Sequence, residues 1–142
     1  MKKFLIIGAA ILTVACGGSR TGKKGTENAP LRDTARISAT TSDGTGRDTL
    51  DFGRLREGEV IEYSVALQNA DTASFVLLNV DTDCGCTTPD FDRKPLRPGD
   101  TSRLTLRYDS RGQYGWQFKS IRIHTSLSKQ PYVLYFVVDV AE

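Results

Sequence analysis

Two cysteines near the middle of the chain carry the most reactive side chains in the sequence. Cys84 and Cys86 are separated by a single residue, Gly85. Residues two apart on an extended chain have Cα atoms about 6.5–7 Å apart, and a disulfide needs about 4.4–6.8 Å. Because glycine bends the chain easily, we predict that the pair can form a local disulfide. The chain-entropy stabilisation of so short a loop is only about 1.6 kcal/mol, so the spacing favours a labile bond over a structural staple.

Several roles are open to this pair: a disulfide that shapes its loop, a metal site, disulfide exchange, redox sensing, or no role. Two thiolates supply half of a tetrahedral zinc site, or can hold a monovalent copper ion. The single histidine, His124, falls on the polar side of a predicted strand, where we expect an exposed residue and not a ligand. Acidic neighbours such as Asp83 and Asp90 disfavour an activated thiolate. We therefore expect no cofactor, with copper or zinc at Cys84 and Cys86 as the weaker alternative.

The other polar residues do not suggest an enzyme. One histidine and scattered acids give neither a Ser-His-Asp set nor a pair of catalytic carboxylates. Trp116 is expected to pack in the core or in a loop and not to form a platform for a ligand. The sequence thus predicts no catalytic residues.

The start of the chain has the pattern of a bacterial secretory signal. Lys2 and Lys3 precede an apolar run over residues 4–12, and small residues follow before Cys16. The run is shorter than the roughly 20 residues of a spanning helix. Cys16 resembles the lipidated cysteine of bacterial lipoproteins, although Thr13 stands where leucine is usual. We predict a signal peptide over 1–15 and a lipid on Cys16. An ordinary signal with a chance cysteine, or an uncut anchor, is the alternative.

Export sets the expected location and charge of the mature protein. Gly17 follows Cys16, where an aspartate would resemble the signal for inner-membrane retention, so we expect a membrane-anchored lipoprotein of the outer membrane facing the periplasm. Cleavage removes two lysines and no acid, which brings the formal net charge from +2 to zero. Because binding to phosphates needs a concentrated basic face, no nucleic-acid partner is expected.

The mature chain divides into a tether and one domain. Residues 16–47 contain few large apolar side chains, which predicts a flexible linker that begins at the lipidated Cys16. A short edge strand over 35–39 is the one element expected within it. Residues 48–142 suffice for one hydrophobic core.

Alternating apolar and polar residues predict β-strands throughout this domain, and no segment has helical periodicity. The run 74–80 is apolar on both faces, which predicts a central strand. A change of parity between Phe118 and Ile121 suggests a β-bulge near Lys119. The fold class is an all-β, immunoglobulin-like β-sandwich of about seven strands. The other expected strands cover 49–53, 61–67, 104–108, 116–125 and 132–140.

Several short motifs are spread from about Leu50 to Ala141: Phe52-Gly53, Glu57-Gly58-Glu59, Leu67-Gln68-Asn69, Cys84-Gly85-Cys86-Thr87, Pro95-Leu96-Arg97-Pro98-Gly99, Tyr108-Asp109 and the segment from Gly115 through Lys119-Ser120-Ile121. Together they resemble the bacterial family known as domain of unknown function 1573. Asp83 stands where that family usually has serine before the first cysteine. The resemblance implies an immunoglobulin-like sandwich, exported and often lipid-anchored, with no established activity.

These observations predict a lipid-anchored protein of the cell envelope, of unknown biochemical activity, that acts as a non-enzymatic binding or structural module. Its expected contacts are the membrane, through the lipid on Cys16, and a protein or envelope component that could add a strand to a sheet edge. The alternative is a thiol-based role of Cys84 and Cys86 in metal binding or disulfide exchange.

Overall fold

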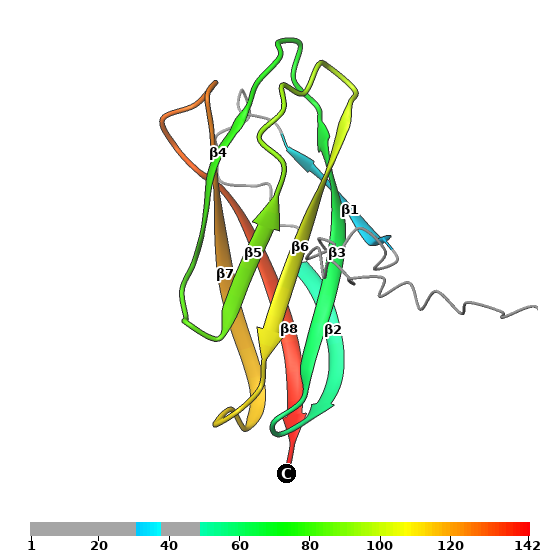
Figure 1. Cartoon of the computed structure of the whole chain (residues 1–142), viewed down its shortest axis with the longest axis vertical. Coiled ribbons are helices and arrows are strands. Elements are labelled where there is room, and N and C mark those ends of the chain that lie inside the picture. The colour runs from blue at the N-terminus through cyan, green and yellow to red at the C-terminus, as the bar shows by residue number, and fades with distance from the viewer. Residues whose placement is uncertain (1–30, 38–48) are drawn as a thin grey trace, which may run out of the picture.

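In the computed structural model, the described residues form eight strands in two packed sheets (Figure 1). The structure describes residues 31–37 and 49–142, so the predicted signal peptide and the lipidation at Cys16 lie outside the described residues. No helix in the described ranges could cross a membrane. The strands are β1 (Leu31–Ile37), β2 (Thr49–Arg56), β3 (Val60–Asn69), β4 (Leu77–Thr82), β5 (Thr87–Phe91), β6 (Thr101–Asp109), β7 (Gly115–Thr125) and β8 (Tyr132–Ala141).

The two sheets have four strands each and mix parallel with antiparallel pairs. One has the order β1-β3-β6-β5 and the other the order β2-β8-β7-β4. The pairs β1–β3 and β2–β8 are parallel, and the other pairs are antiparallel. The predicted all-β sandwich is confirmed, with eight strands in place of about seven.

The first strand comes from within the range predicted to be a linker. The edge strand expected over 35–39 runs from Leu31 to Ile37 and pairs in parallel with β3. Ala35 and Ile37 are at most 1% exposed, and the carbonyl of Ile37 accepts a 2.9 Å hydrogen bond from Ala70 N. Residues 31–37 therefore belong to the sandwich in addition to the described part of the predicted domain, 49–142. Two alternate apolar residues are enough for an edge strand that pairs with β3.

Two edge strands differ from the sequence-based expectation. β5 was not predicted, because Pro89 interrupts its short alternating pattern. At a sheet edge proline is tolerated, since its missing N–H faces away from the ladder. The expected central strand over 74–80 is instead the edge strand β4, and Leu78 on its outer side is 52% exposed.

β7 is regular, so the predicted bulge near Lys119 is wrong. Its pairing with β8 runs without a shift from Gly115 to Ile123. The parity change in the sequence arises because Trp116 and Phe118 lie on the outer face, where they are 76% and 62% exposed. Trp116 therefore packs neither in the core nor in a buried loop, contrary to the prediction.

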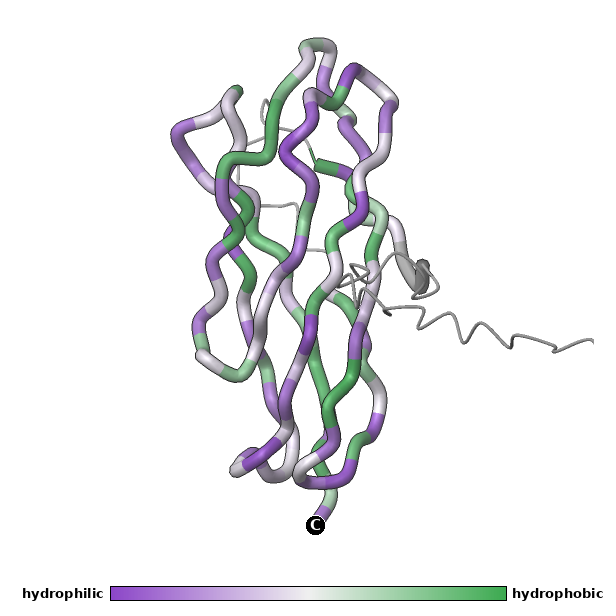
Figure 2. The backbone as a smooth tube through the Cα atoms, viewed as in Figure 1, coloured by the Kyte–Doolittle hydropathy of each residue, from purple (hydrophilic) through white to green (hydrophobic). Residues whose placement is uncertain are grey.

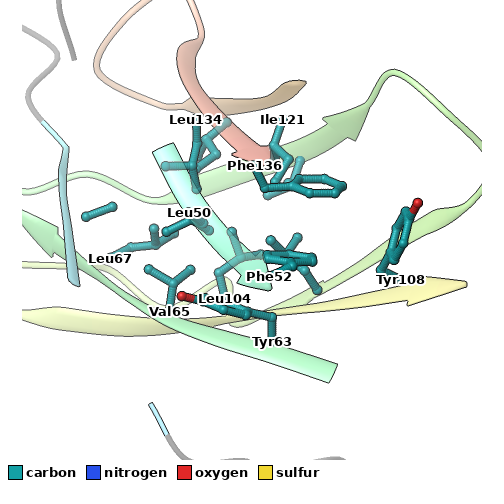
Figure 3. Close-up of a cluster of buried hydrophobic side chains, with 14 of the residues drawn as sticks. Leu50, Phe52, Tyr63, Val65, Leu67, Leu104, Tyr108, Ile121, Leu134 and Phe136 are labelled. Atoms are coloured by element: carbon teal, nitrogen blue, oxygen red, sulfur yellow. The ribbon is translucent and has the colours of Figure 1, made fainter. Parts of the chain in front are cut away.

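A stack of aromatic rings joins the two sheets. The Phe52 ring lies between Tyr63 and Phe136, with centroid distances of 4.4 Å and 4.3 Å (Figure 3). Tyr108 meets Phe136 edge to face at 5.6 Å. Hydrophobic and hydrophilic residues alternate along the strands (Figure 2), which places one face of each sheet against this core.

The hydroxyl of Tyr108 is buried and has no hydrogen-bond partner among the described residues. Tyr108 is 0% exposed, and burial, followed by the charge of Asp109, raises the pKa of its hydroxyl. A buried polar group without a partner costs about 1–3 kcal/mol. The ring therefore stabilises the core while its oxygen opposes folding.

Replacing Tyr108 by phenylalanine is expected to raise the free energy of unfolding by about 1 kcal/mol, because it removes this unpaired hydroxyl and keeps the ring. Urea denaturation measures the change. As a comparison, Phe136→Ala should lower the free energy of unfolding by about 3–5 kcal/mol. A destabilised Tyr108→Phe variant would contradict the assignment of an unpaired hydroxyl.

The contribution of β1 can be tested in the same way. Ile37→Ala removes a fully buried side chain and should lower the free energy of unfolding by about 2–4 kcal/mol. Arg36→Ala, on the exposed side of the same strand, should change it by less than about 0.5 kcal/mol. Equal effects of the two substitutions would show that β1 does not pack on the core.

Candidate functional site

The chain crosses from one sheet to the other through Asp83–Cys86. β4 ends at Thr82 in the sheet β2-β8-β7-β4, and β5 begins at Thr87 in the other sheet. Cys84 and Cys86 form a disulfide in this crossing, with Cα atoms 5.2 Å apart. In an extended chain, the Cα atoms of residues two apart lie about 6.5 Å from each other. The bend at Gly85 shortens this distance and brings the cysteines within bonding range.

Both sheets hold the disulfide loop. The Thr82 hydroxyl lies 3.0 Å from the Cys84 carbonyl and 3.1 Å from the Thr87 carbonyl, and it donates its one proton between them. On the other side, the Asp109 N–H of β6 donates to the Cys86 carbonyl at 2.8 Å. Cys86 also packs against the core. The loop is therefore fixed at both ends while the disulfide stays half-exposed.

The sequence-predicted metal ligands do not gather into a larger site. Within 31–37 and 49–142, no three His, Cys, Asp or Glu residues are placed to hold one ion. His124 instead pairs with Asp81 at 2.9 Å and lies opposite Asn79, near the start of β4. His124 therefore lies in the β4–β7 pair, whereas the two cysteines lie in the loop between β4 and β5.

Asp83 continues the pairing of β4 with β7 by one residue and then ends it. Its N–H donates to the Ser120 carbonyl at 3.3 Å. Its carboxylate accepts from the Ser120 N–H at 2.8 Å and from the Ser120 hydroxyl at 3.2 Å. β4 itself faces β7 only from Ile121 to Thr125. Beyond Ser120, the chain of the disulfide loop has turned away toward β5.

The first half of β7 consequently has a free edge, which we define as Gly115–Lys119. Among the described strands, only β8 pairs with these residues. Figure 1 shows β7 continuing past the β4–β5 turn toward the end of the molecule that carries the C-terminus. Ser120 directs its N–H and C=O toward Asp83, and backbone direction alternates along a strand. Trp116 and Phe118 therefore direct their backbone groups away from β8, off the edge.

The same two residues carry exposed aromatic side chains on the outer face of the sheet. The Phe118 ring stacks on Tyr135 of β8 with centroids 5.0 Å apart. Tyr114, just before β7, is 58% exposed. We call Tyr114, Trp116, Phe118 and Tyr135 the aromatic patch. Contiguous exposed apolar surface of this kind marks an interaction site more often than scattered single residues do.

A tight turn leads the chain into the free edge. Arg111 bonds the carboxylate of Asp109, and this hydrogen bond is the main reason why the pKa of Asp109 falls to about 2. The Gln113 N–H donates to the Ser110 carbonyl at 3.0 Å, and Gln117 Nε2 donates to the Tyr114 carbonyl. These bonds fix where β7 begins.

A hollow lies over β5 and β6, in the sheet β1-β3-β6-β5. It has a volume of about 750 Å³ and is lined by charged and polar residues that include Asp90, Asp100 and Arg103. Asp92 and Lys94 at its wall form an ion pair with each other at 2.7 Å. Since these opposite charges pair with each other, the hollow points to a ligand less clearly than the β7 edge does.

The disulfide loop predicts a specific redox behaviour. Native protein should show no free thiol at Cys84 or Cys86 until a reductant is added. Because the loop is so short, the Cys84→Ser/Cys86→Ser double variant should lose at most about 1.6 kcal/mol of unfolding free energy. Thiol titration with and without reductant, and urea denaturation, measure the two effects. A loss above about 3 kcal/mol would show that the bond is a structural staple.

Comparisons with known proteins agree with the fold. Residues 45–140 match the model of the family described as "Protein of unknown function (DUF1573)". Comparison with curated protein sequences gave no significant match.

Solved structures resemble this chain at low sequence identity. A protein of unknown function from Porphyromonas gingivalis W83 has a TM-score of 0.56 and 20% identity, over 64% of this chain and 43% of that one. The VesB protease of Vibrio cholerae has a TM-score of 0.51 and 10% identity, over 67% of this chain and 30% of that one. This chain thus spans less than half the length of either protein, and identities this low establish the fold alone.

Proposed function

This chain belongs to the DUF1573 family of proteins of unknown function, and we propose that it is a non-enzymatic binding module of the cell envelope. We further propose that it is exported, cleaved after residue 15, and anchored by a lipid on Cys16 in the outer membrane, facing the periplasm. The motivation is the sequence of residues 1–16, which has a basic start, an apolar run and a cysteine after small residues. Its binding partner is a protein or another envelope component, and not a nucleic acid.

The observation that carries the binding role is the free edge of β7. Unpaired backbone N–H and C=O groups on a sheet edge can bind an added strand, and alternate side chains then provide specificity. Here Trp116 and Phe118 supply both the backbone groups and large exposed rings. Tryptophan and tyrosine are also enriched among the residues that dominate binding energy.

A second candidate function uses the disulfide. Its motivation is the half-exposed position of Cys84 and Cys86 in a loop whose closure stabilises the fold little. In disulfide exchange, an external dithiol would reduce the bond to two thiols and would itself become a disulfide, so that two electrons and two protons are transferred. The reduced pair is also the form that could bind copper or zinc. Elemental analysis of the reduced protein and turnover of a dithiol distinguish these two thiol roles from the binding role.

The binding role predicts that Trp116→Thr and Phe118→Thr each reduce the recovery of envelope components at least tenfold in affinity capture from envelope extracts. Threonine suits an exposed strand position, so both variants should keep the melting temperature of the parent protein. Leu127→Ala is the matched control, because Leu127 is also an exposed apolar residue, 43% exposed, but lies outside the patch. Unchanged recovery with both variants, together with turnover of a dithiol substrate by the parent protein, would contradict the proposal.

A further inference from the structure

We propose that the strand added to the free edge of β7 is the β7 strand of a second copy of this chain. This inference rests on the proposed function, because it uses the same edge and names its occupant. The two β7 strands would run antiparallel about a twofold axis at Gln117 and join two four-stranded sheets into one. In that arrangement Trp116 of each copy faces Phe118 of the other.

The free edge is bounded at both ends, and the twofold axis at Gln117 lies midway between these boundaries. Asp83 occupies the position opposite Ser120, which closes one end. At the other end, Gly115 has a φ of 68°, a left-handed value that turns the chain away from the edge. An axis at Gln117 pairs Gly115 of one copy with Lys119 of the other, so the whole free edge is used and neither end is obstructed.

Neighbouring registers fit less well. An axis at Phe118 would place Trp116 opposite Ser120, where Asp83 already lies. An axis at Trp116 would need Tyr114 to continue the strand, although Gly115 bends the chain and Gln117 holds the Tyr114 carbonyl. The axis at Gln117 is therefore the one that the two boundaries of the free edge select.

Backbone hydrogen bonding supports the same register. Trp116 and Phe118 direct their N–H and C=O groups off the edge, whereas Gln117 directs its groups toward β8. In an antiparallel pair, two facing residues that point toward each other exchange two hydrogen bonds. The pairing of Trp116 with Phe118 thus satisfies all the backbone groups that these two residues leave unpaired in one copy.

The charge pattern favours a second copy over an arbitrary peptide. Residues 113–118 read Gln-Tyr-Gly-Trp-Gln-Phe and carry no charge, so antiparallel self-pairing places no like charges opposite each other. Lys119 faces Gly115. Exposed sheet edges are usually protected by lysine, proline or a bulge. Within Gly115–Lys119 there is no proline and no bulge, and the one lysine lies at the end of the edge, which leaves Trp116 and Phe118 unprotected, as expected for an edge that is covered in the working protein.

The aromatic side chains provide the buried area. Two copies of Trp116 and Phe118, 76% and 62% exposed in one copy, would form a continuous row flanked by Tyr135. Each such ring buries about 150–250 Å² when fully covered. Four rings that are partly buried already contribute less than about 1,000 Å², so even with the paired backbone the interface falls in the class below about 1,200 Å² that weak, transient complexes occupy. We therefore expect a weak, reversible dimer.

The first test is the molar mass of the full chain in mild detergent over a range of protein concentrations, by light scattering or sedimentation equilibrium. The parent protein should pass from monomer to dimer. Phe118→Lys should raise the dimer dissociation constant at least tenfold, while Leu127→Ala leaves it unchanged. Equal melting temperatures establish that the variants are folded. A monomer at every concentration, or a dimer that Phe118→Lys does not weaken, overturns the inference.

The second test fixes the register. Gln117 would face Gln117 of the other copy in a pair that is not hydrogen-bonded, with Cα atoms about 4.5 Å apart, which a disulfide can span. Gln117→Cys should therefore give a covalent dimer under mild oxidation. Ser128→Cys, in the turn before β8, and the parent chain should not. Absence of the Gln117→Cys dimer overturns the proposed register.

These outcomes are separable from those of the proposed function. If the chain is monomeric and Trp116→Thr still loses envelope components, the edge binds a different chain, and only the second-copy inference fails. If the dimer forms as described but no variant changes envelope capture, the aromatic patch serves self-association and the wider binding role fails.

Discussion

β4 stops pairing with β7 at Thr82 because the chain must reach the other sheet to begin β5. This crossing determines most of what is distinctive in the molecule. It closes one side of the sandwich between β4 and β5, it creates the short loop that holds the disulfide, and it leaves Gly115–Lys119 of β7 with a single neighbouring strand. The candidate site is thus a consequence of topology, since β7 is longer than the strand that covers its edge.

The disulfide is better understood as part of this crossing than as a staple. A bond between Cys84 and Cys86 restricts few conformations of the unfolded chain, so it adds little stability. It does fix the bend that follows Asp83, and the carboxylate of Asp83 ends the ladder at Ser120. The loop therefore defines where the free edge begins. The residues of the two candidate roles therefore adjoin at this boundary.

The sequence was sufficient to predict the fold class, because most strands alternate apolar and polar residues with a period of two. The local disulfide was also accessible, since spacing and glycine together decide whether two cysteines can meet. β5 was missed because Pro89 reads as a strand breaker unless the strand is known to be an edge. Trp116 was expected to pack in the core or in a loop, because large apolar residues are usually buried. Its exposure follows from the order of the strands, which the sequence alone does not reveal.

The core and the aromatic patch lie on opposite faces of the same sheet. In β8, Phe136 points into the stack with Phe52, while Tyr135 lies outside against Phe118. Alternation of side chains therefore separates the residues that hold the sheets together from those that form the patch. Because Trp116 and Phe118 are largely exposed, replacing them removes little buried surface from the folded monomer. Effects of these substitutions on association can consequently be attributed to the edge itself and not to loss of the core.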